Sequence, residues 1–254
     1  MTDKLANVSF FSNEEQAVAA FHATGLHAEF DFFTPHECNM FIEASHTLQN
    51  AKNGEFRPTL NPHTESEVFL QAMRDKKLIT IIEKLLGGKA SGLQTQYFFG
   101  LPGTQGFSIH QDNFFVEAQP ADYFISTWLA LADVDLGNGT IYAFPGAHKE
   151  GLLPVKKLEG GAKMGQDSNA HNEVCLVPDR YARLDICVPQ GTLVFLHSLT
   201  PHGSYDNHSN RTRPVMLNNY IRQGTPFRSG RSAKRKEIPL EGPIVTSEMH
   251  AHVS

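Results

Sequence analysis

The sequence is poor in features that define several whole classes of protein. It has three cysteines and one tryptophan in 254 residues. The cysteines, Cys38, Cys175 and Cys187, are odd in number and far apart, which argues against a disulfide framework and a cysteine-based zinc site. No apolar run approaches the roughly 20 residues needed to cross a bilayer. Residues 1–11 lack the apolar segment of a signal peptide. We therefore expect a cytoplasmic protein with no membrane partner.

The charge and composition narrow the classes further. The net charge is −5, which gives no general electrostatic attraction to nucleic acid. Hydrophobic residues make up 40% of the chain, so a disordered protein is excluded. A chain of this length buries enough surface to fold without a structural metal. We predict a single domain over residues 1–254, and the oligomeric state stays open.

The first third of the chain is expected to be largely helical. Segments 12–15, 34–37 and 64–67 have the spacing of a capping box, and Pro35 suits a first helical position. Residues 26–33 between two of these helices alternate like a strand. Gly87 and Gly88 are typical of a helix end. We interpret residues 1–90 as a helical N-terminal support.

The residue pattern changes after Gly92, where runs of β-branched and aromatic residues alternate with turn residues. Many short strands without intervening helices indicate a jelly roll rather than a parallel sheet. We expect a mainly β protein with flanking helices, a jelly-roll core at 91–222 and a basic tail at 223–254. Segment 145–181 has no periodicity and is typical of a lid or a disordered loop. Strands are predicted near Leu93–Phe99, Phe107–Asn113, Tyr123–Ala132, Thr140–Phe144, Leu184–Val188, Thr192–Leu196 and Val215–Ile221, with a hairpin-type turn at Asn138-Gly139.

A candidate metal site begins with His110-Gln111-Asp112. Side chains two apart in a strand point to the same face, so this imidazole and carboxylate could bind one metal. The pair is weak evidence alone. A second histidine, His202, follows an apolar strand and precedes a glycine. Two histidines and one carboxylate form the facial triad of non-haem Fe(II) oxygenases. Arg213 follows, and a guanidinium pairs well with a carboxylate such as the distal one of 2-oxoglutarate.

With these residues in place, the chain resembles the phytanoyl-CoA dioxygenase family of Fe(II)/2-oxoglutarate-dependent oxygenases. The resemblance covers most of the chain. It rests on the His110–Asp112 motif, on the segment from Asn138-Gly139 through Pro145-Gly-Ala-His148 to Gly151, on His202-Gly-Ser204 with Asn207 and Arg213, and on the early Phe21…Gly25…Phe33-Thr-Pro…Glu37 pattern.

The resemblance implies a double-stranded β-helix (jelly-roll, cupin-like) core and a role for each matching residue. His110, Asp112 and His202 would be the catalytic iron ligands. Arg213 would pair with the distal carboxylate of 2-oxoglutarate, assisted by Ser204, and Trp128 would line the same pocket. O₂ would be the second cosubstrate, and succinate and CO₂ the coproducts. The chain departs from the family pattern at Ala147, where serine is usual, and at residues 98–103, which lack the lysine of many members.

Several residues also have plainer interpretations. Trp128 could be an ordinary core residue, Ser204 could close a turn, and His148 is more typical of structural hydrogen bonding than of metal binding. The basic residues of 228–236 could form either a solvated tail or a flap that favours an anionic substrate.

Substrate contacts are predicted less directly. We name Gln96, Tyr97 and Asn113 as candidates, and the strand parity leaves open whether Gln94 and Gln96 or Thr95 and Tyr97 face the substrate. The expected function is hydroxylation of a small polar or anionic metabolite. The alternatives are a cupin-like dioxygenase or isomerase that does not use 2-oxoglutarate, and a non-catalytic metabolite-binding protein.

Overall fold

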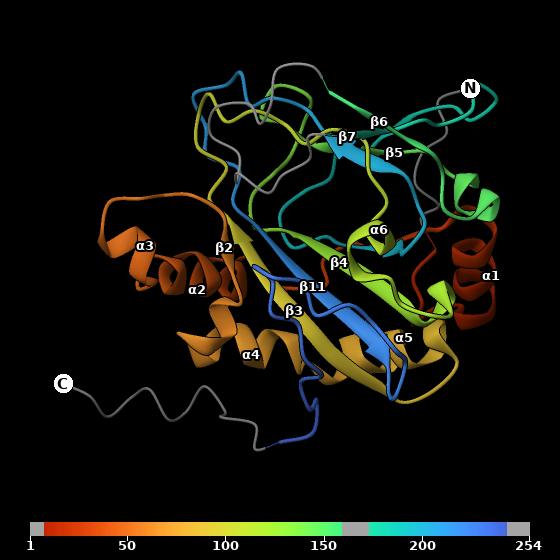
Figure 1. Ribbon diagram of the computed structural model, residues 1–254. Coiled ribbons are helices and arrows are strands. Elements are labelled where there is room, and N and C mark those ends of the chain that lie inside the picture. Colours follow the sequence, from red (N-terminus) through yellow and green to blue (C-terminus); the bar gives the residue numbers. More distant parts are fainter. Residues whose placement is uncertain (1–7, 159–172, 243–254) are drawn as a thin grey trace.

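The computed structural model describes residues 8–158 and 173–242. Most of the first third is helical, as predicted, and the strands follow it (Figure 1). The longer helices are α1 (Glu14–Thr24), α2 (Pro35–Ser45), α4 (Glu67–Met73) and α5 (Lys76–Leu86), and the short ones are α3 (Gln49–Lys52), η1 (Pro62–Thr64), α6 (Asn113–Val116), η2 (Ala121–Tyr123) and η3 (Ala147–Glu150).

The strands form a jelly roll of antiparallel sheets, which confirms the predicted fold class. The larger sheet has the order β1-β9-β4-β11-β3-β2, and the smaller one has the order β10-β5-β8. Strands β6 and β7 pair separately. Their bounds are Leu26–Glu29 (β1), Thr59–Leu60 (β2), Ala90–Phe98 (β3), Phe124–Ala130 (β4), Ile141–Ala143 (β5), Val155–Lys157 (β6), Glu173–Cys175 (β7), Leu184–Asp185 (β8), Leu193–His197 (β9), His202–Ser204 (β10) and Val215–Arg222 (β11).

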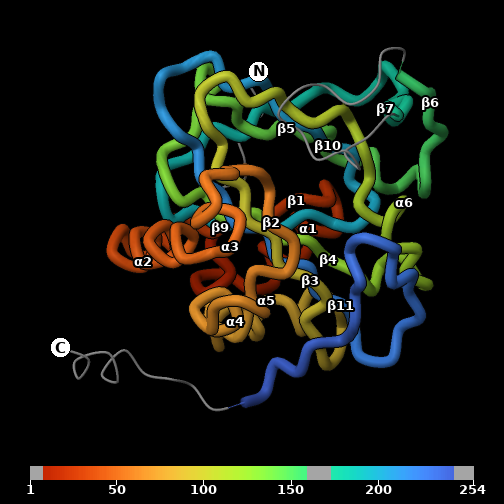
Figure 2. The backbone as a smooth tube through the Cα atoms, turned by 60° about the vertical axis from the view of Figure 1, so that its left-hand side comes forward, coloured from red at the N-terminus to blue at the C-terminus, as the bar shows by residue number. Residues whose placement is uncertain are grey.

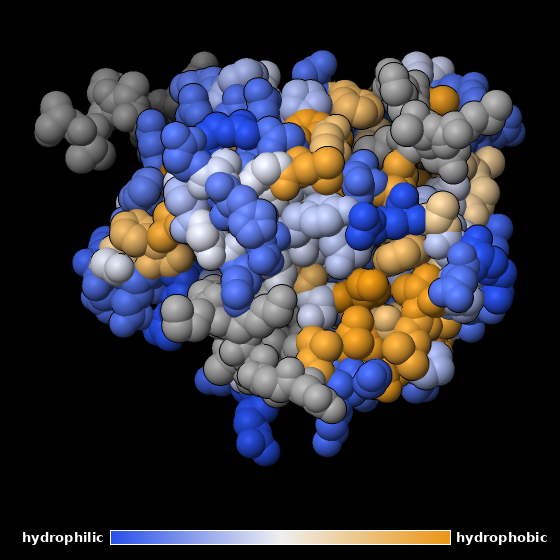
Figure 3. All heavy atoms as spheres, turned by 90° about the horizontal axis from the view of Figure 1, so that it is seen from above, coloured by the Kyte–Doolittle hydropathy of each residue, from blue (hydrophilic) through white to orange (hydrophobic). Residues whose placement is uncertain are grey.

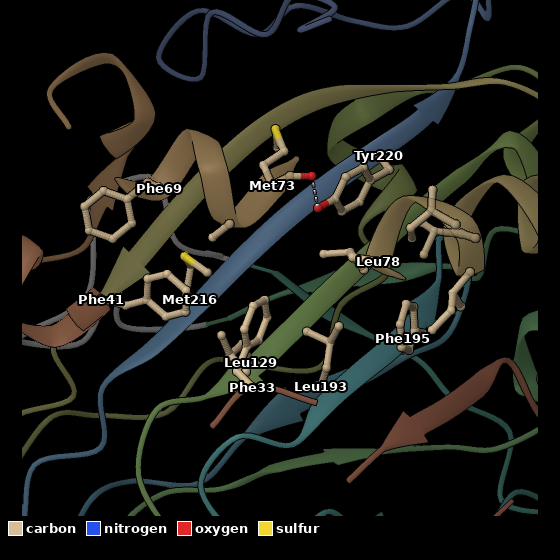
Figure 4. Close-up of a cluster of buried hydrophobic side chains, with 14 of the residues drawn as sticks. Phe33, Phe41, Phe69, Met73, Leu78, Leu129, Leu193, Phe195, Met216 and Tyr220 are labelled. Carbon is tan, nitrogen blue, oxygen red and sulfur yellow. Dashed lines mark hydrogen bonds between the residues drawn. The ribbon is translucent and has the colours of Figure 1, made fainter. Parts of the chain in front are cut away.

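Helices α4 and α5 cover one face of the larger sheet, below β3 and β11 in Figure 1. α5 is amphipathic because five of its apolar residues recur at helical spacing and are buried, and it ends at Gly87 with a left-handed φ of 65°. Aromatic and aliphatic side chains from these helices interlock with those of β4, β9 and β11 (Figure 4). The Tyr220 hydroxyl, in the middle of this core, donates to the carbonyl of Met73 at 3.0 Å. The opposite face of the sheet is left for the site.

Helix starts agree only partly with the sequence predictions. Thr34 and Glu37 form the predicted capping box with Pro35 in the first turn. The first helix is instead capped by Asn13, whose side chain accepts from the amide of Gln16. The third predicted box does not form, because residues 62–64 belong to the 3₁₀ helix η1 and α4 begins only at Glu67.

Two strand predictions also need correction. Residues 107–113 do not form a strand: they have one isolated bridge at His110 and turn into α6 at Asn113. The turn at Asn138-Gly139 does not close a hairpin, because β4 and β5, on either side of it, belong to different sheets. Asn138 instead holds this crossover together by bonds to the backbone of Asp133 and Asp135.

The segment after β11 packs back onto the body of the protein. Gly92 and Ile238 exchange two backbone hydrogen bonds, of 2.9 and 2.7 Å. Arg228 donates to the carbonyls of Phe114 and Phe115 in α6. Figure 2 shows α6 next to the blue segment that follows β11. Of the predicted basic tail, residues 223–242 are thus a folded strap, and residues 243–254 lie outside the described part.

The predicted lid at 145–181 is partly regular. It contains η3 and the β6–β7 pair, and residues 159–172 lie outside the described ranges. Leu152, Val155 and Leu176, in or next to this pair, are exposed. Figure 3 shows that hydrophobic residues gather in patches on the upper face, next to hydrophilic ones. In the described ranges, every helix is too short or too polar to cross a bilayer.

Candidate metal and cosubstrate site

Two histidines and one aspartate lie close together in the wall of a cavity between the two main sheets. One ligand atom from each of His110, Asp112 and His202 lies within 4.8 Å of the others. The Nε2 atoms of His110 and His202 lie 3.5 and 3.9 Å from Oδ1 of Asp112. No other such group of three potential ligands occurs among the described residues. A single divalent ion fits between these three atoms, with open positions remaining.

The backbone sets the spacing of the two histidines. His110 and His202 form a reciprocal bridge, with N–H to carbonyl distances of 2.9 and 3.0 Å. Asp112 reaches the same point from the turn that opens α6, where its backbone is helical. The sequence predicted that a strand would place His110 and Asp112 on the same face. In the structure a turn brings the carboxylate to the imidazole instead.

Each histidine presents the same nitrogen toward the aspartate. Nδ1 of His110 donates to the carbonyl of Ser108 at 2.8 Å, and Nδ1 of His202 donates to that of Thr200 at 3.0 Å. The bond to a carbonyl places the proton on Nδ1, which leaves Nε2 as the lone-pair donor of a neutral ring. Both rings are thus oriented as metal ligands.

Electrostatics favour the charge states that metal binding requires. Burial and the neighbouring His110 lower the pKa of His202 to about 4, so this ring is neutral at pH 7. Burial opposes ionisation of Asp112, but His202, His110 and Ser126 together hold its pKa below the usual value. His202 is therefore a neutral imidazole and Asp112 an ionised carboxylate, which are the states that metal binding requires.

A chain of hydrogen bonds occupies the second oxygen of Asp112. The Ser126 hydroxyl on β4 donates to Oδ2 at 2.5 Å, and Asn219 on β11 donates to that hydroxyl at 2.8 Å. Gln96 on β3 donates to the side-chain oxygen Oδ1 of Asn219 at 3.3 Å. Oδ1 is thereby left as the oxygen that faces the histidines. Sequence reasoning missed Ser126 and Asn219, although Ser126 shares strand parity with Trp128.

Arg213 is buried in the same cavity with an unused donor. The residue is 6% exposed, and its Nε has no hydrogen-bond partner among the described residues. Burial lowers the pKa of the guanidinium to about 10, so it remains charged at neutral pH. A buried cation with an unsatisfied N–H is costly unless an anion binds to it. This orphaned donor fits a carboxylate of 2-oxoglutarate.

Ser204 and Trp128 line the cavity near Arg213, as expected. The Ser204 hydroxyl accepts from the amide of Phe107 at 2.8 Å, which leaves its own proton available for donation. Trp128 is 3% exposed and packs in a buried apolar cluster, so its placement is compatible with both a core role and a pocket role.

The candidate substrate residues separate into two groups. Gln94 and Gln96 face the cavity, whereas Tyr97 points to the opposite face of the sheet, against Phe69 and Phe99. Asn113 is buried and holds its own loop through two bonds to Ala118. The positions of Tyr97 and Asn113 argue against direct substrate contact.

The cavity itself has a volume of about 220 Å³ and combines aromatic walls with polar groups. The structure brings together around it the predicted residues His110, Asp112, His202, Arg213, Ser204, Trp128 and Gln96. His148 is not among them. Its Nε2 contacts the carbonyl of His22 at 3.2 Å, and its ring packs on that of His197, which supports a structural role.

Comparisons with known proteins agree with this geometry. A curated phytanoyl-CoA dioxygenase from Arabidopsis thaliana is 33% identical over 123 residues, which are 48% of this chain and 41% of that protein. A probable alpha-ketoglutarate-dependent hypophosphite dioxygenase from Stutzerimonas stutzeri is 27% identical over 173 residues, 66% of this chain and 59% of that protein. The matched regions thus span about half the length of these relatives.

Solved structures show the same fold. The alpha ketoglutarate dependent carbocyclase SnoK from nogalamycin biosynthesis superposes with a TM-score of 0.69 at 19% identity, covering 94% of this chain and 95% of that one. EctD from S. alaskensis, solved with 2-oxoglutarate and 5-hydroxyectoine, has a TM-score of 0.64 at 19% identity, covering 86% and 79%. The sequence model of the phytanoyl-CoA dioxygenase family matches residues 10–215. The chain therefore belongs to the phytanoyl-CoA dioxygenase family of iron- and 2-oxoglutarate-dependent oxygenases.

Proposed function

We propose that this protein is an Fe(II)/2-oxoglutarate-dependent hydroxylase of a small polar or anionic metabolite. The observation that carries the proposal is the pairing of a two-histidine, one-aspartate group with a buried arginine whose Nε is unpartnered. A jelly-roll protein that uses no oxo-acid has no need for such an arginine. Fe(II) would be held by His110, Asp112 and His202, and it would supply the activation of O₂.

The residues of the chain position the reactants. Arg213 and Ser204 would bind the distal carboxylate of 2-oxoglutarate by charge-assisted hydrogen bonds. Trp128 and Phe98 contribute apolar surface to the lining of the cavity. Asp112, which Ser126 orients, would supply a carboxylate ligand to the iron, and halogenating relatives lack that ligand. This favours hydroxylation over halogenation.

The size and lining of the cavity support a small substrate. Polar amides at Gln94, Gln96 and Asn219 line one wall and can hydrogen-bond a polar molecule. The names of two relatives, a hypophosphite dioxygenase and a protein solved with 5-hydroxyectoine, refer to small polar compounds.

The test has two stages. Anaerobic protein mixed with Fe(II) and 2-oxoglutarate should develop a weak visible charge-transfer band. Metabolites are then screened for substrate-triggered succinate release, and the product is weighed. A gain of one oxygen atom supports hydroxylation, whereas loss of two hydrogens or an unchanged mass would overturn it. Absence of the band would count against 2-oxoglutarate as cosubstrate.

A further inference from the structure

A second arginine reaches the cavity from the strap that follows β11. Arg235 lines the cavity together with Ser232 and Ala233. Its Nε donates to Oε1 of Gln94 at 2.9 Å, and its Nη1 donates to the carbonyl of Phe115 at 3.2 Å. These two contacts come from β3 and from α6, so the guanidinium is held from two sides.

The backbone around Arg235 is also fixed. The amide of Arg235 donates to the carbonyl of Ser229 at 2.8 Å, and the Ser229 hydroxyl donates to the carbonyl of Arg235 at 2.9 Å. Residues 229–235 thus form a closed turn, and the bridge between Ile238 and Gly92 fastens the chain just beyond it. A long flexible side chain restrained in this way has already lost much of its conformational entropy before any ligand binds.

Arg235 nevertheless lacks a counter-ion. It forms no ion pair with a carboxylate of the described residues, and its Nη2 makes no hydrogen bond to them. Its contacts are to an amide oxygen and to backbone carbonyls, which orient the group but do not neutralise it. Burial lowers its pKa, and the charge of Asp112 only partly offsets that effect.

The charges around the cavity do not balance without a further anion. The ionisable side chains that line it are His110, His202, Asp112, Arg213 and Arg235. Histidines that bind a metal are neutral, so these five groups together carry one positive charge when the metal is bound. Fe(II) adds two positive charges and 2-oxoglutarate adds two negative ones. The loaded cavity would therefore still carry one positive charge. With Asp112 committed to the metal and Arg213 to the cosubstrate, the uncompensated group is Arg235.

We propose that Arg235 binds an oxyanion of the substrate, a carboxylate or a phosphate-type group, with Nη2 as the free donor and Gln94 as its support. This inference rests on the proposed function, since it assigns the substrate of the same site. A guanidinium suits both oxyanions because its planar N–H groups match their oxygen atoms. The anion would lie on the β3 side of the cavity, away from Arg213.

The experiment measures anion binding without turnover. Protein is loaded with Mn²⁺ and saturating 2-oxoglutarate without oxygen, so that the Arg213 position is filled. Inorganic phosphate, methylphosphonate and acetate are titrated by calorimetry. At least one should bind saturably to the wild type, and Arg235→Gln should weaken it at least tenfold. The matched control is Arg231→Gln, which changes an exposed arginine of the same turn and should bind like the wild type.

Two outcomes would overturn the proposal: binding by Arg235→Gln that equals that of the wild type, and binding of none of the three anions by the wild type. Arg235→Lys keeps the charge and should retain part of the affinity, which separates loss of the anion site from misfolding. Anion binding without substrate-triggered succinate release would leave Arg235 assigned and refute the proposed reaction. If acids and their neutral amides trigger succinate release equally well, the proposed reaction is supported and the assignment of Arg235 to an anion is refuted.

Discussion

At the scale of single residues, each side chain of the metal site presents one atom because its other polar atom is already bonded. The histidines donate Nδ1 to backbone carbonyls, and Asp112 accepts a hydroxyl at Oδ2. The residue types could be predicted from the sequence because the iron chemistry restricts them to imidazole and carboxylate. Ser126 and Asn219 could not, since serine and asparagine in a strand suit many buried hydrogen bonds.

Ser126→Ala should weaken metal binding by roughly 10- to 100-fold, the usual effect of losing a partner that orients a ligand. The reason is that Asp112 loses the donor that holds its second oxygen. Metal affinity is measured by competition with a coloured chelator. Thr127→Val is the control, because within the described part of the chain the Thr127 hydroxyl bonds to the backbone carbonyl of Asn218 on β11 and to no other group. Equal loss in both variants would assign the effect to packing.

Arg213→Ala should raise the dissociation constant of 2-oxoglutarate by roughly 10- to 100-fold, because a hydrogen bond between charged groups contributes about 1.5–3 kcal/mol. Arg213→Lys should recover only part of this, since an ammonium lacks the planar fork. The anaerobic charge-transfer band reports the constant. Unchanged affinity in the alanine variant would remove Arg213 from the cosubstrate site.

At the scale of secondary structure, the long strands were predictable and the short ones only in part: β5 and β8 lie within predicted strands, whereas β2, β6, β7 and β10 were not predicted. β3, β4, β9 and β11 follow runs of apolar and β-branched residues, which give a clear signal. β10 has three residues, and all of them are small or polar, so no hydrophobic periodicity can develop. The convergence of His110 with Asp112 depends on a turn whose geometry comes from tertiary packing, and local sequence does not encode it.

The loop that follows β3 supports Arg213 through a close backbone approach. Gly100 has a left-handed φ of 57°, and a Cβ there would lie 2.2 Å from the carbonyl oxygen of Arg213. The Gly100 carbonyl accepts the Arg213 amide at 2.9 Å and the Asn207 side chain at 3.0 Å. Any side chain at this position must displace the arginine backbone.

Gly100→Ala should therefore raise the dissociation constant of 2-oxoglutarate severalfold and destabilise the fold by about 1–3 kcal/mol. Gly103→Ala separates the two effects, because Gly103 has a φ of 82° with no heavy atom within 4 Å of the added Cβ. That variant should lose stability from backbone strain alone and keep its affinity. Similar affinity in both variants would disprove the positioning role of Gly100.

At the scale of the whole molecule, a buried histidine cluster joins the N-terminal helix to the β core. His197 at the end of β9 packs between Phe21, His148 and Asp122, with His22 nearby. Burial and the neighbouring His148 lower the pKa of His197 to about 4. The unfolded chain therefore takes up a proton near pH 6.5, whereas the folded protein takes it up only near pH 4.

The free energy of unfolding of the metal-free protein should consequently fall as the pH drops from 6.5 to 4. One such proton contributes a slope of up to about 1.4 kcal/mol per pH unit. His197→Gln should flatten this part of the curve in urea unfolding at several pH values. His208→Gln changes an exposed histidine and should leave the slope as in the wild type. A slope that is unaltered by both would exclude His197 as the titrating group.

The reciprocal backbone bridge between His110 and His202 has a consequence for metal choice. Because two backbone hydrogen bonds set the distance between the two histidines, the geometry of the metal site exists before any ion binds. A preformed site of nitrogen and oxygen ligands also binds Co²⁺, Ni²⁺ and Zn²⁺, in general more tightly than it binds Fe²⁺. Which of these ions binds in the cell then depends on the concentration at which each ion is available. We therefore expect traces of Co²⁺, Ni²⁺ or Zn²⁺ to inhibit the proposed oxygenase by displacing Fe²⁺.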